Sequence, residues 1–297
     1  MKGVISLDKI IVPAPAKINL ALDIKGNRED GFHEIETIMQ SISLCDYLVI
    51  KKNRGGIGLH TSTKDLPKGS ENIAYLAADK IISYAGLSTG VDIEIEKRIP
   101  IAGGLAGGSS DAAAVLNGIN KLYGLNIGDS TLLDMAAELG SDVPFCLHGG
   151  TTFASGRGEE IEQLRDLKRL DLIIVNPGIK ISTAWVYQEY DKLVKKAEPL
   201  IRKLLILIKD NAEINWNEGW VNVLENVVLP YYQDIVRIKE NLKKMGASFV
   251  LMTGSGPTVF AVVEDQKMGE KIRKNWPEEK DFISTAWTVK KDFYELC

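Results

Sequence analysis

Alternating apolar and polar residues mark the first half of the chain, and this period of two predicts half-buried β-strands. The clearest case is the stretch from Val91 to Glu96, where Val91, Ile93 and Ile95 alternate with acidic residues. Residues 16–24 alternate in the same way, and residues 47–52 are a shorter candidate strand. Apolar residues at helical spacing predict helices over residues 72–84, 110–123 and 131–139. Strands and helices therefore mix along the chain, as in an α+β protein.

The second half continues this mixture after a polar connection over residues 156–169. The apolar run 170–175 begins a new block, so we expect a boundary between an N-terminal unit, residues 1–163, and a C-terminal unit, residues 164–297. The pattern predicts further helices over 183–195, 199–209, 233–245 and 267–275, and strands over 151–155, 248–252, 259–263 and 283–289. No internal repeat or low-complexity tract is visible in either unit.

The composition is that of a globular protein and narrows the class of partners. With 297 residues and 45% hydrophobic content, the chain can bury the core of one large or two modest domains. The net charge is −4 and the basic residues are scattered among acids, so a nucleic-acid partner is not expected. Any phosphate group must then be held by a local site.

The cysteines and the N-terminal segment favour a cytoplasmic protein without a membrane partner. Cys45, Cys146 and Cys297 are odd in number and widely spaced, so neither a disulfide framework nor a zinc site is indicated. The three histidines likewise lack metal-ligand spacing. Residues 1–11 lack the apolar core of a signal peptide, and no run reaches membrane-spanning length. We expect a monomer or a weak homodimer.

The most informative segment is a glycine-rich loop between the strand that ends at Glu96 and the alanine-rich helix after it. Glycines let the backbone approach an anion, and a helix N-terminus adds unpaired N–H groups and a positive partial charge. A nucleoside triphosphate is therefore the first ligand to consider, with a plain strand-to-helix turn as the alternative. The candidate nucleotide-binding residues are Pro100, Ile101, Ala102, Gly103, Gly104, Leu105, Ala106, Gly107, Gly108, Ser109 and Ser110.

Two common nucleotide motifs are excluded by the details of this loop. A Walker loop needs Lys directly after its last glycine, and here Ser109 follows Gly108. A dinucleotide fingerprint needs spaced glycines and a later acidic residue at the end of a strand, whereas this loop has adjacent glycine pairs.

The loop instead resembles that of the GHMP kinases, and three other segments strengthen the likeness: residues 15–20, 30–34 and 140–145. The resemblance runs from about residue 15 to the loop 253–256. It implies a two-lobed α+β fold with an N-terminal nucleotide-binding lobe, a ferredoxin-like C-terminal lobe and an active site in the cleft between them. ATP and Mg²⁺ are the implied cofactors.

Within this family, the segments 30–34 and 140–145 resemble those of the branch that serves the non-mevalonate pathway to isoprenoid precursors. The implied substrate is a small molecule that carries a cytidine diphosphate group, and the implied reaction is ATP-dependent phosphorylation of the 2-hydroxyl of its methylerythritol part. Two alternatives stay open: another small-molecule kinase of the mevalonate or homoserine kinase type, and a non-catalytic nucleotide-dependent sensor. The first should lack these two segments, and the second should have lost Lys17 or Asp142.

The same resemblance implies a catalytic pair. Taken alone, Asp142 between Ser141 and Val143 is typical of a turn or a helix N-cap, and Lys17 in an alternating strand is typical of a solvent-facing lysine. The family match implies instead that Asp142 is the base that receives the acceptor hydroxyl's proton, and that Lys17 stands close to it. Asn19, on the same strand face as Lys17, would orient the substrate.

Aromatic residues are the candidates for holding a cytosine ring. Phe32, where the family more often has Tyr, and Tyr187 would stack on the base, with Trp185 as an alternative to Tyr187. His33 would hydrogen-bond the cytosine edge through its backbone or its ring, and Thr183 lies in the same matching segment as Tyr187. From the residues alone, core packing is the ordinary role for each aromatic and a structural role the ordinary one for His33.

A second glycine segment, residues 253–258, joins two strand candidates. It is either a hairpin turn or, as the resemblance implies, a loop that packs against the first glycine loop. The chain departs from the family pattern at residues 222–225, which keep Asn222 and Glu225 but lack the usual Asp between them. We assign no catalysis to that segment.

Overall fold

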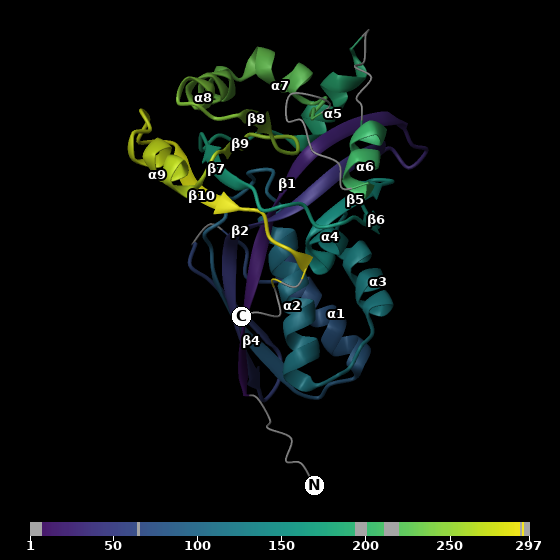
Figure 1. Ribbon diagram of the computed structural model, residues 1–297. Helices are drawn as coiled ribbons and strands as arrows, with labels where there is room; N and C mark the ends of the chain where they lie inside the picture. The colour runs from purple at the N-terminus through teal and green to yellow at the C-terminus, as the bar shows by residue number, and fades with distance from the viewer. Residues whose placement is uncertain (1–7, 64–65, 194–200, 211–219, 292, 294–297) are drawn as a thin grey trace.

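The computed structural model describes residues 8–63, 66–193, 201–210, 220–291 and 293 (Figure 1). A long antiparallel pair of strands forms its centre, and β1 runs from the lower to the upper part of the molecule in Figure 1. These strands are β1 (Lys9–Asn27) and β2 (His33–Asn53), which pair along nearly their whole length. The sequence predicted only the inner part of β1 and the last residues of β2.

The first sheet extends this pair on both sides of β2. Its order is β3-β4-β2-β5-β6, with β1 also paired to β2, and the β3–β4 contact is parallel. The added strands are β3 (Ile57–Thr61), β4 (Gly90–Glu96), β5 (Thr151–Ser155) and β6 (Glu160–Gln163). Strand β6 lies where the sequence predicted only a polar connection, because its exposed acidic residues hide the strand pattern.

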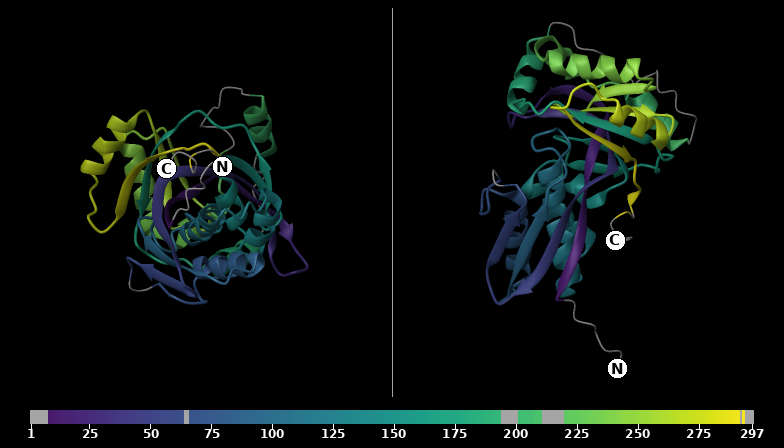
Figure 2. Two further views of the ribbon diagram at one scale, coloured as in Figure 1. Left: turned by 90° about the horizontal axis from the view of Figure 1, so that it is seen from below. Right: turned by 90° about the vertical axis from the view of Figure 1, so that its left-hand side faces the viewer.

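Four helices cover one face of the lower part of this sheet (Figure 2). They are α1 (Ile73–Ala85), α2 (Gly107–Tyr123), α3 (Asp129–Leu139) and α4 (Val143–His148). The alternating strand residues Ile93 and Ile95 turn inward against the alanine-rich face of α2, as their pattern predicts. Helices α1 to α3 confirm the predicted segments, whereas α4 was not predicted because six residues are too few for a periodicity to show.

The second sheet is fully antiparallel and lies at the other end of the molecule (Figure 1). Its order is β10-β7-β9-β8, from β7 (Asp171–Asn176), β8 (Phe249–Met252), β9 (Val259–Val263) and β10 (Phe282–Trp287). Its helices are α5 (Thr183–Asp191), α6 (Ile201–Lys209), α7 (Glu225–Tyr231), α8 (Gln233–Lys244) and α9 (Gln266–Lys274). The β-α-β-β-α-β connection and this strand order confirm the ferredoxin-like lobe.

The predicted helices over 183–195 and 199–209 correspond to α5 and α6, and their residues 194–200 lie outside the described part of the chain. Helix α7, which contains Pro230, was not predicted. The first sheet ends with β6 and the second begins with β7, but the boundary at residues 163 and 164 stays a prediction. No helix among the described residues is long and apolar enough to cross a membrane.

Strand β1 is buried on both faces from Val12 to Ile24. Toward its start the helices cover it, and further along the second sheet packs on it, with Ile18 and Leu20 in one core with Phe260. The pairing with β2 shifts at three points, between Pro15 and Lys17, between Asn19 and Ala21, and near Ile24. Such bulges re-aim side chains and are common beside active sites. The first two shifts flank Lys17 and Asn19. These polar side chains would otherwise be unfavourable in a strand that is buried on both faces.

Candidate active site

One cavity of about 930 Å³ collects nearly all of the predicted site residues. Its lining comes from β1, the start of β2, both glycine loops, the start of α4 and helix α5. Leu105 and Ser110 are exceptions, because Leu105 is buried in the core and the Ser110 hydroxyl donates to the Pro15 carbonyl at 2.7 Å. The predicted residues that line the cavity are Lys17, Asn19, Phe32, His33, Pro100–Gly104, Ala106–Ser109, Asp142, Thr183 and Tyr187.

Lys17 and Asp142 form an ion pair in this cavity. The Lys17 Nζ lies 3.7 Å from the Asp142 Oδ2, with the lysine side chain 5% exposed and the aspartate 38% exposed. The expectation that Lys17 stands close to Asp142 is thus confirmed. A separation of 3.7 Å is too long for a direct hydrogen bond, so both groups keep hydrogen-bonding capacity for a third polar group placed beside them.

Asp142 sits at the N-cap position of α4, where the ordinary role of an aspartate is to cap the helix. Its side chain makes no capping hydrogen bond and is directed instead to Lys17. The backbone position of a cap is therefore used to place a carboxylate in the cavity.

Asn19 and Thr253 hold Lys17 in place. The Lys17 Nζ donates to the Asn19 Oδ1 at 2.8 Å, and the same oxygen accepts from the Thr253 hydroxyl at 3.2 Å. The Asn19 amide also donates to the Thr37 hydroxyl at 2.8 Å. Both acceptor and donor groups of the buried Asn19 side chain are engaged, as a buried amide requires. In this structure Asn19 orients Lys17, and a contact to substrate stays a prediction.

The first glycine loop has left-handed backbone at alternate positions. Ala102, Gly104 and Ala106 have φ of 53°, 75° and 56°. Left-handed alanines cost of the order of 1–3 kcal/mol each, and such strain concentrates at functional sites. Left-handed residues interleaved in a loop also build the concave backbone that binds anions. The loop leads directly into α2, so an anion there would also meet the positive end of a helix of 17 residues.

The second glycine loop packs against the first, as the resemblance implied. A Cβ on Gly104 would lie 2.6 Å from the Thr253 carbonyl and 3.0 Å from that of Gly256, so only glycine allows the two loops to approach. Asn222 fixes the second loop by donating to the carbonyls of Met252 and Gly254 at 2.9 and 2.7 Å. The segment 222–225 is thus structural, in line with the absence of a catalytic assignment there.

Aromatic residues also line the cavity. The rings of His33 and Tyr187 lie with centroids 4.8 Å apart, and the Arg157 guanidinium lies 5.0 Å from the centroid of Phe32. Burial raises the pKa of Tyr187 to about 12, with the Asp142 charge as a second cause, so its hydroxyl stays protonated. Trp185 does not line the cavity.

Trp185 packs away from the site, edge-on to Tyr231 and Tyr232 at 5.3 and 5.7 Å between ring centroids. Thr183, at the start of α5, is linked to the second glycine loop, since its hydroxyl lies 2.9 Å from that of Ser255. Of the two aromatics left open by the sequence, Tyr187 is therefore the one that the cavity contains.

A buried charged cluster at the cavity wall was not predicted. The Lys97 ammonium pairs with Asp111 at 2.6 Å and also with Asp46. Burial raises the pKa of Asp111 to about 7, although Lys97 opposes this shift, and one of its carboxylate oxygens is buried without a hydrogen-bond partner. Burial lowers the pKa of Lys97, but the two carboxylates outweigh it and the net shift is upward. The sequence feature that could have indicated this cluster is Asp111, an acidic residue on the apolar face of a predicted helix.

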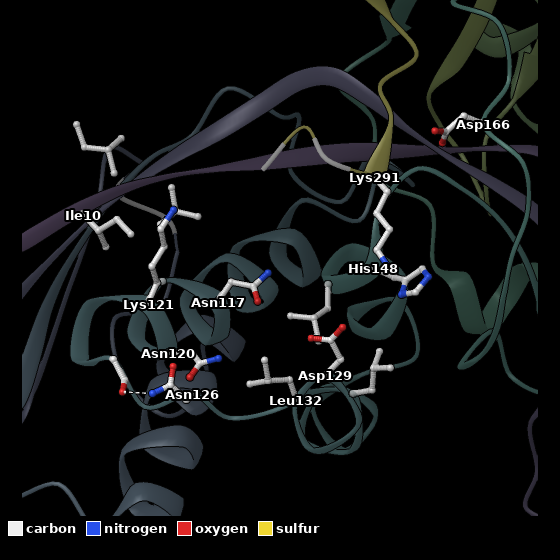
Figure 3. Close-up of a pocket in the computed structure, with 16 residues that line it drawn as sticks. Ile10, Asn117, Asn120, Lys121, Asn126, Asp129, Leu132, His148, Asp166 and Lys291 are labelled. Carbon is white, nitrogen blue, oxygen red and sulfur yellow. Dashed lines mark hydrogen bonds between the residues drawn. The ribbon is translucent and has the colours of Figure 1, made fainter. Parts of the chain in front are cut away.

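A second hollow of about 950 Å³ lies beside α2 and α3 (Figure 3). Lys291 points toward His148 there, and burial together with this nearby charge lowers the pKa of His148. None of the predicted site residues lines it. In the described part of the chain, no group of three or more His, Cys, Asp or Glu side chains is placed to hold a metal ion. Cys45 and Cys146 are buried and form no disulfide, and Cys297 lies outside the described residues.

The family models agree with this geometry. Residues 72–150 match the GHMP kinases N terminal domain, and residues 197–281 match the GHMP kinases C terminal domain. The chain therefore belongs to the GHMP kinases, enzymes that phosphorylate small molecules with ATP as the donor.

The similar proteins narrow the branch of the family. The chain is 43% identical over 267 residues to a 4-diphosphocytidyl-2-C-methyl-D-erythritol kinase of Syntrophomonas wolfei, covering 90% of this chain and 94% of the relative. The crystal structure of a 4-(cytidine 5'-diphospho)-2C-methyl-D-erythritol kinase matches with a TM-score of 0.76 at 32% identity, covering 93% of this chain and 99% of the other. A homoserine kinase from Cytophaga hutchinsonii, with a TM-score of 0.73 but 19% identity over 98% of this chain and 97% of its own, shares the fold.

Proposed function

We propose that this chain transfers the γ-phosphoryl group of ATP to the 2-hydroxyl of 4-diphosphocytidyl-2-C-methyl-D-erythritol. The observation that carries the proposal is a single cavity that is lined by a glycine loop, by the Lys17–Asp142 pair and by a group of aromatic side chains. The loop suits a triphosphate, the pair suits an acceptor hydroxyl, and the aromatic end suits a cytosine ring.

The proposal that a triphosphate binds at the first glycine loop is supported by the strained backbone of this loop and by the start of α2 beside it. ATP would bring Mg²⁺ with it as part of the donor substrate, since this ion usually keeps phosphate and water oxygens and takes only one or two protein ligands. Ser109 lines the cavity and offers a hydroxyl to a phosphate oxygen or to the ion. The Ser110 hydroxyl is already bonded to Pro15, so Ser109 is the better candidate of the two.

The catalytic step follows from the gap between Lys17 and Asp142. A substrate hydroxyl placed in that gap donates its proton to the Asp142 carboxylate as its oxygen bonds to the γ-phosphorus. The bond from the γ-phosphorus to the β,γ-bridging oxygen breaks, and ADP leaves. The ammonium of Lys17 stabilises the negative charge that develops on the attacking oxygen.

The cytidine end distinguishes this substrate from mevalonate or homoserine, which have no base to stack. Phe32 is 52% exposed, and it lines the cavity together with Tyr187 and His33. Retention of both Lys17 and Asp142 speaks against a non-catalytic sensor, because such a protein has no use for a base beside the acceptor position.

The test is a phosphorylation assay with ³¹P NMR detection. The purified protein, ATP and Mg²⁺ are incubated with 4-diphosphocytidyl-2-C-methyl-D-erythritol, mevalonate or homoserine. We expect a new phosphomonoester and ADP in equal amounts only with the first substrate. Turnover of mevalonate or homoserine instead would favour the other GHMP kinases, and ATP binding without turnover of any substrate would favour the sensor.

A further inference from the structure

The ring of His33 is held from two sides by one helix. His33 begins β2, and its Nε2 lies 3.0 and 3.1 Å from the two carboxylate oxygens of Asp191. The Tyr187 ring packs on it with centroids 4.8 Å apart. Tyr187 and Asp191 are four residues apart on α5, so they share a face of that helix and act on the same imidazole.

A carboxylate next to an imidazole nitrogen decides where the ring proton lies. An ionised aspartate only accepts hydrogen bonds, so the Nε2 facing Asp191 must carry the hydrogen. In the neutral imidazole the other nitrogen, Nδ1, then has a lone pair and accepts. The Asp191 contact thus selects one of the two neutral tautomers of His33.

The other ring nitrogen, Nδ1, has no hydrogen-bond partner among the described residues. His33 lines the cavity, and its side chain is 12% exposed. Among the described residues, the hydrogen bonds of its ring are those made by Nε2 to Asp191. An acceptor in the lining of the cavity can take a hydrogen bond from an amine and repels a carbonyl oxygen.

We infer that Asp191 is a positioning residue that fixes His33 as an acceptor through Nδ1 and thereby makes the site selective for cytosine over uracil. The inference rests on the proposed function, which places a cytosine ring at this end of the cavity. Cytosine carries an exocyclic amine, a donor, at the position where uracil carries a carbonyl oxygen, an acceptor. Only cytosine matches the tautomer that Asp191 selects.

The experiment compares cytidine diphosphate and uridine diphosphate by calorimetry on three full-length proteins: the wild type, Asp191→Ala and Glu189→Ala. Glu189 supplies the matched control, because its carboxylate lies on the same helix but pairs with Lys192 at 2.6 Å. The wild type should prefer cytidine diphosphate by about 10- to 100-fold, the range for one mismatched buried polar pair. Asp191→Ala should bring that ratio to within about threefold, because His33 can then adopt either tautomer, and Glu189→Ala should keep it.

The ratio of the two affinities is also insensitive to partial misfolding, because an inactive fraction of Asp191→Ala lowers the number of binding sites for both ligands alike. A wild-type ratio near one would overturn both this inference and the cytosine assignment of the proposed function. A strong wild-type preference that survives in Asp191→Ala would overturn the inference alone and leave the proposed function standing.

The tautomer itself is measured by ¹⁵N NMR of the histidine rings, with His33→Gln to assign the signal among the three histidines. At a pH where the ring of the ligand-free wild type carries a single proton, we expect that proton on Nε2. Asp191→Ala should show a mixture. A wild-type ring with its proton on Nδ1 would overturn the inference whatever the ligand ratios show.

Discussion

Replacing Asp142 by asparagine separates binding from chemistry at the proposed catalytic pair. The amide keeps the shape of the side chain but cannot take a proton from the acceptor hydroxyl. Positioned acid–base catalysis is worth about 10²–10⁴ in rate, or about 2.7–5.4 kcal/mol of barrier, so turnover of Asp142→Asn should fall by that factor. The affinities for ATP and for a cytidine nucleotide should stay within a few-fold, because both ligands are held mainly by other residues of the cavity.

The structure also bounds the stability cost of this substitution. Losing one partner of an ion pair is severe when both groups are buried, but Asp142 is 38% exposed and 3.7 Å from Lys17. Solvent screening then keeps the cost below about 1 kcal/mol, and Lys17 retains its hydrogen bond to Asn19. The Asp142→Asn protein should therefore fold normally, and a lost rate reports on chemistry.

The assay is single-turnover phosphorylation of 4-diphosphocytidyl-2-C-methyl-D-erythritol with saturating ATP and Mg²⁺. Asp134, an exposed aspartate of α3, supplies the control, and Asp134→Asn should keep the full rate. A rate of Asp142→Asn within about threefold of the wild type, less than 1 kcal/mol of barrier, would refute the assignment of the base.

The Lys17→Met variant extends this test to the other member of the pair. Methionine keeps the buried length of the side chain but removes its charge, so we expect slower turnover and weaker binding. If Lys17 and Asp142 act as a unit, the double variant should be little slower than the slower single variant, because the same step has already lost its help. Fully additive losses would show that the two residues act independently.

Four further substitutions test other parts of the cavity. Gly108→Val should weaken ATP binding tenfold or more while leaving the fold intact, because a Cβ there meets only Ile73 at 3.6 Å. Gly104→Ala should lower the melting temperature, because its Cβ would collide with the second glycine loop. Arg157→Ala should weaken cytidine diphosphate binding about two- to fivefold by calorimetry, and an unchanged affinity would remove the cation–π contact with Phe32 from the site. Burial raises the pKa of Asp111 from 3.8 to about 7 and favours the protonated form in the fold, so the contribution of this group to stability is lost as pH rises from about 4 to 7. The melting temperature of Asp111→Asn should therefore increase relative to that of the wild type over this range, and a difference that does not change with pH would contradict this.

The sequence predicted β1 but not the burial of its polar residues. Alternation over residues 16–24 predicts one apolar and one exposed face, and Lys17 falls on the face that should meet solvent. In the structure Lys17 is 4% exposed, because Asp142 and the Asn19–Thr253 pair lie beside its ammonium group. Asp142 and Thr253 lie far from Lys17 in the sequence, so no local pattern can report them. The family resemblance supplied the position of Lys17 because it encodes tertiary contacts that periodicity does not.

The residues missed by the sequence share one property: their role depends on partners from several elements. Lys97 follows β4, Asp46 lies within β2 and Asp111 within α2, and only the packed core brings the three together. The sequence favoured Tyr187 but left Trp185 open as an alternative, for a related reason. Two residues apart on a helix, they point to different sides, and nothing in a short helix of mixed composition tells which side faces the cavity.

Lys17 and His33 lie on the paired strands β1 and β2, but their side chains are held by different neighbouring elements. Lys17 is held through Asn19 and the second glycine loop, whereas His33, on the partner strand, is held by α5. The Thr183–Ser255 contact links α5 to the second glycine loop, but among the described residues no hydrogen bond joins the side chains of Lys17 or Asn19 to His33. A change at His33 therefore leaves the hydrogen-bond partners of Lys17 in place. Effects of distant, independent sites add in free energy. Base recognition can therefore vary at Asp191 while the Lys17–Asp142 pair keeps its geometry, and the specificity of such a kinase is separable from its chemistry.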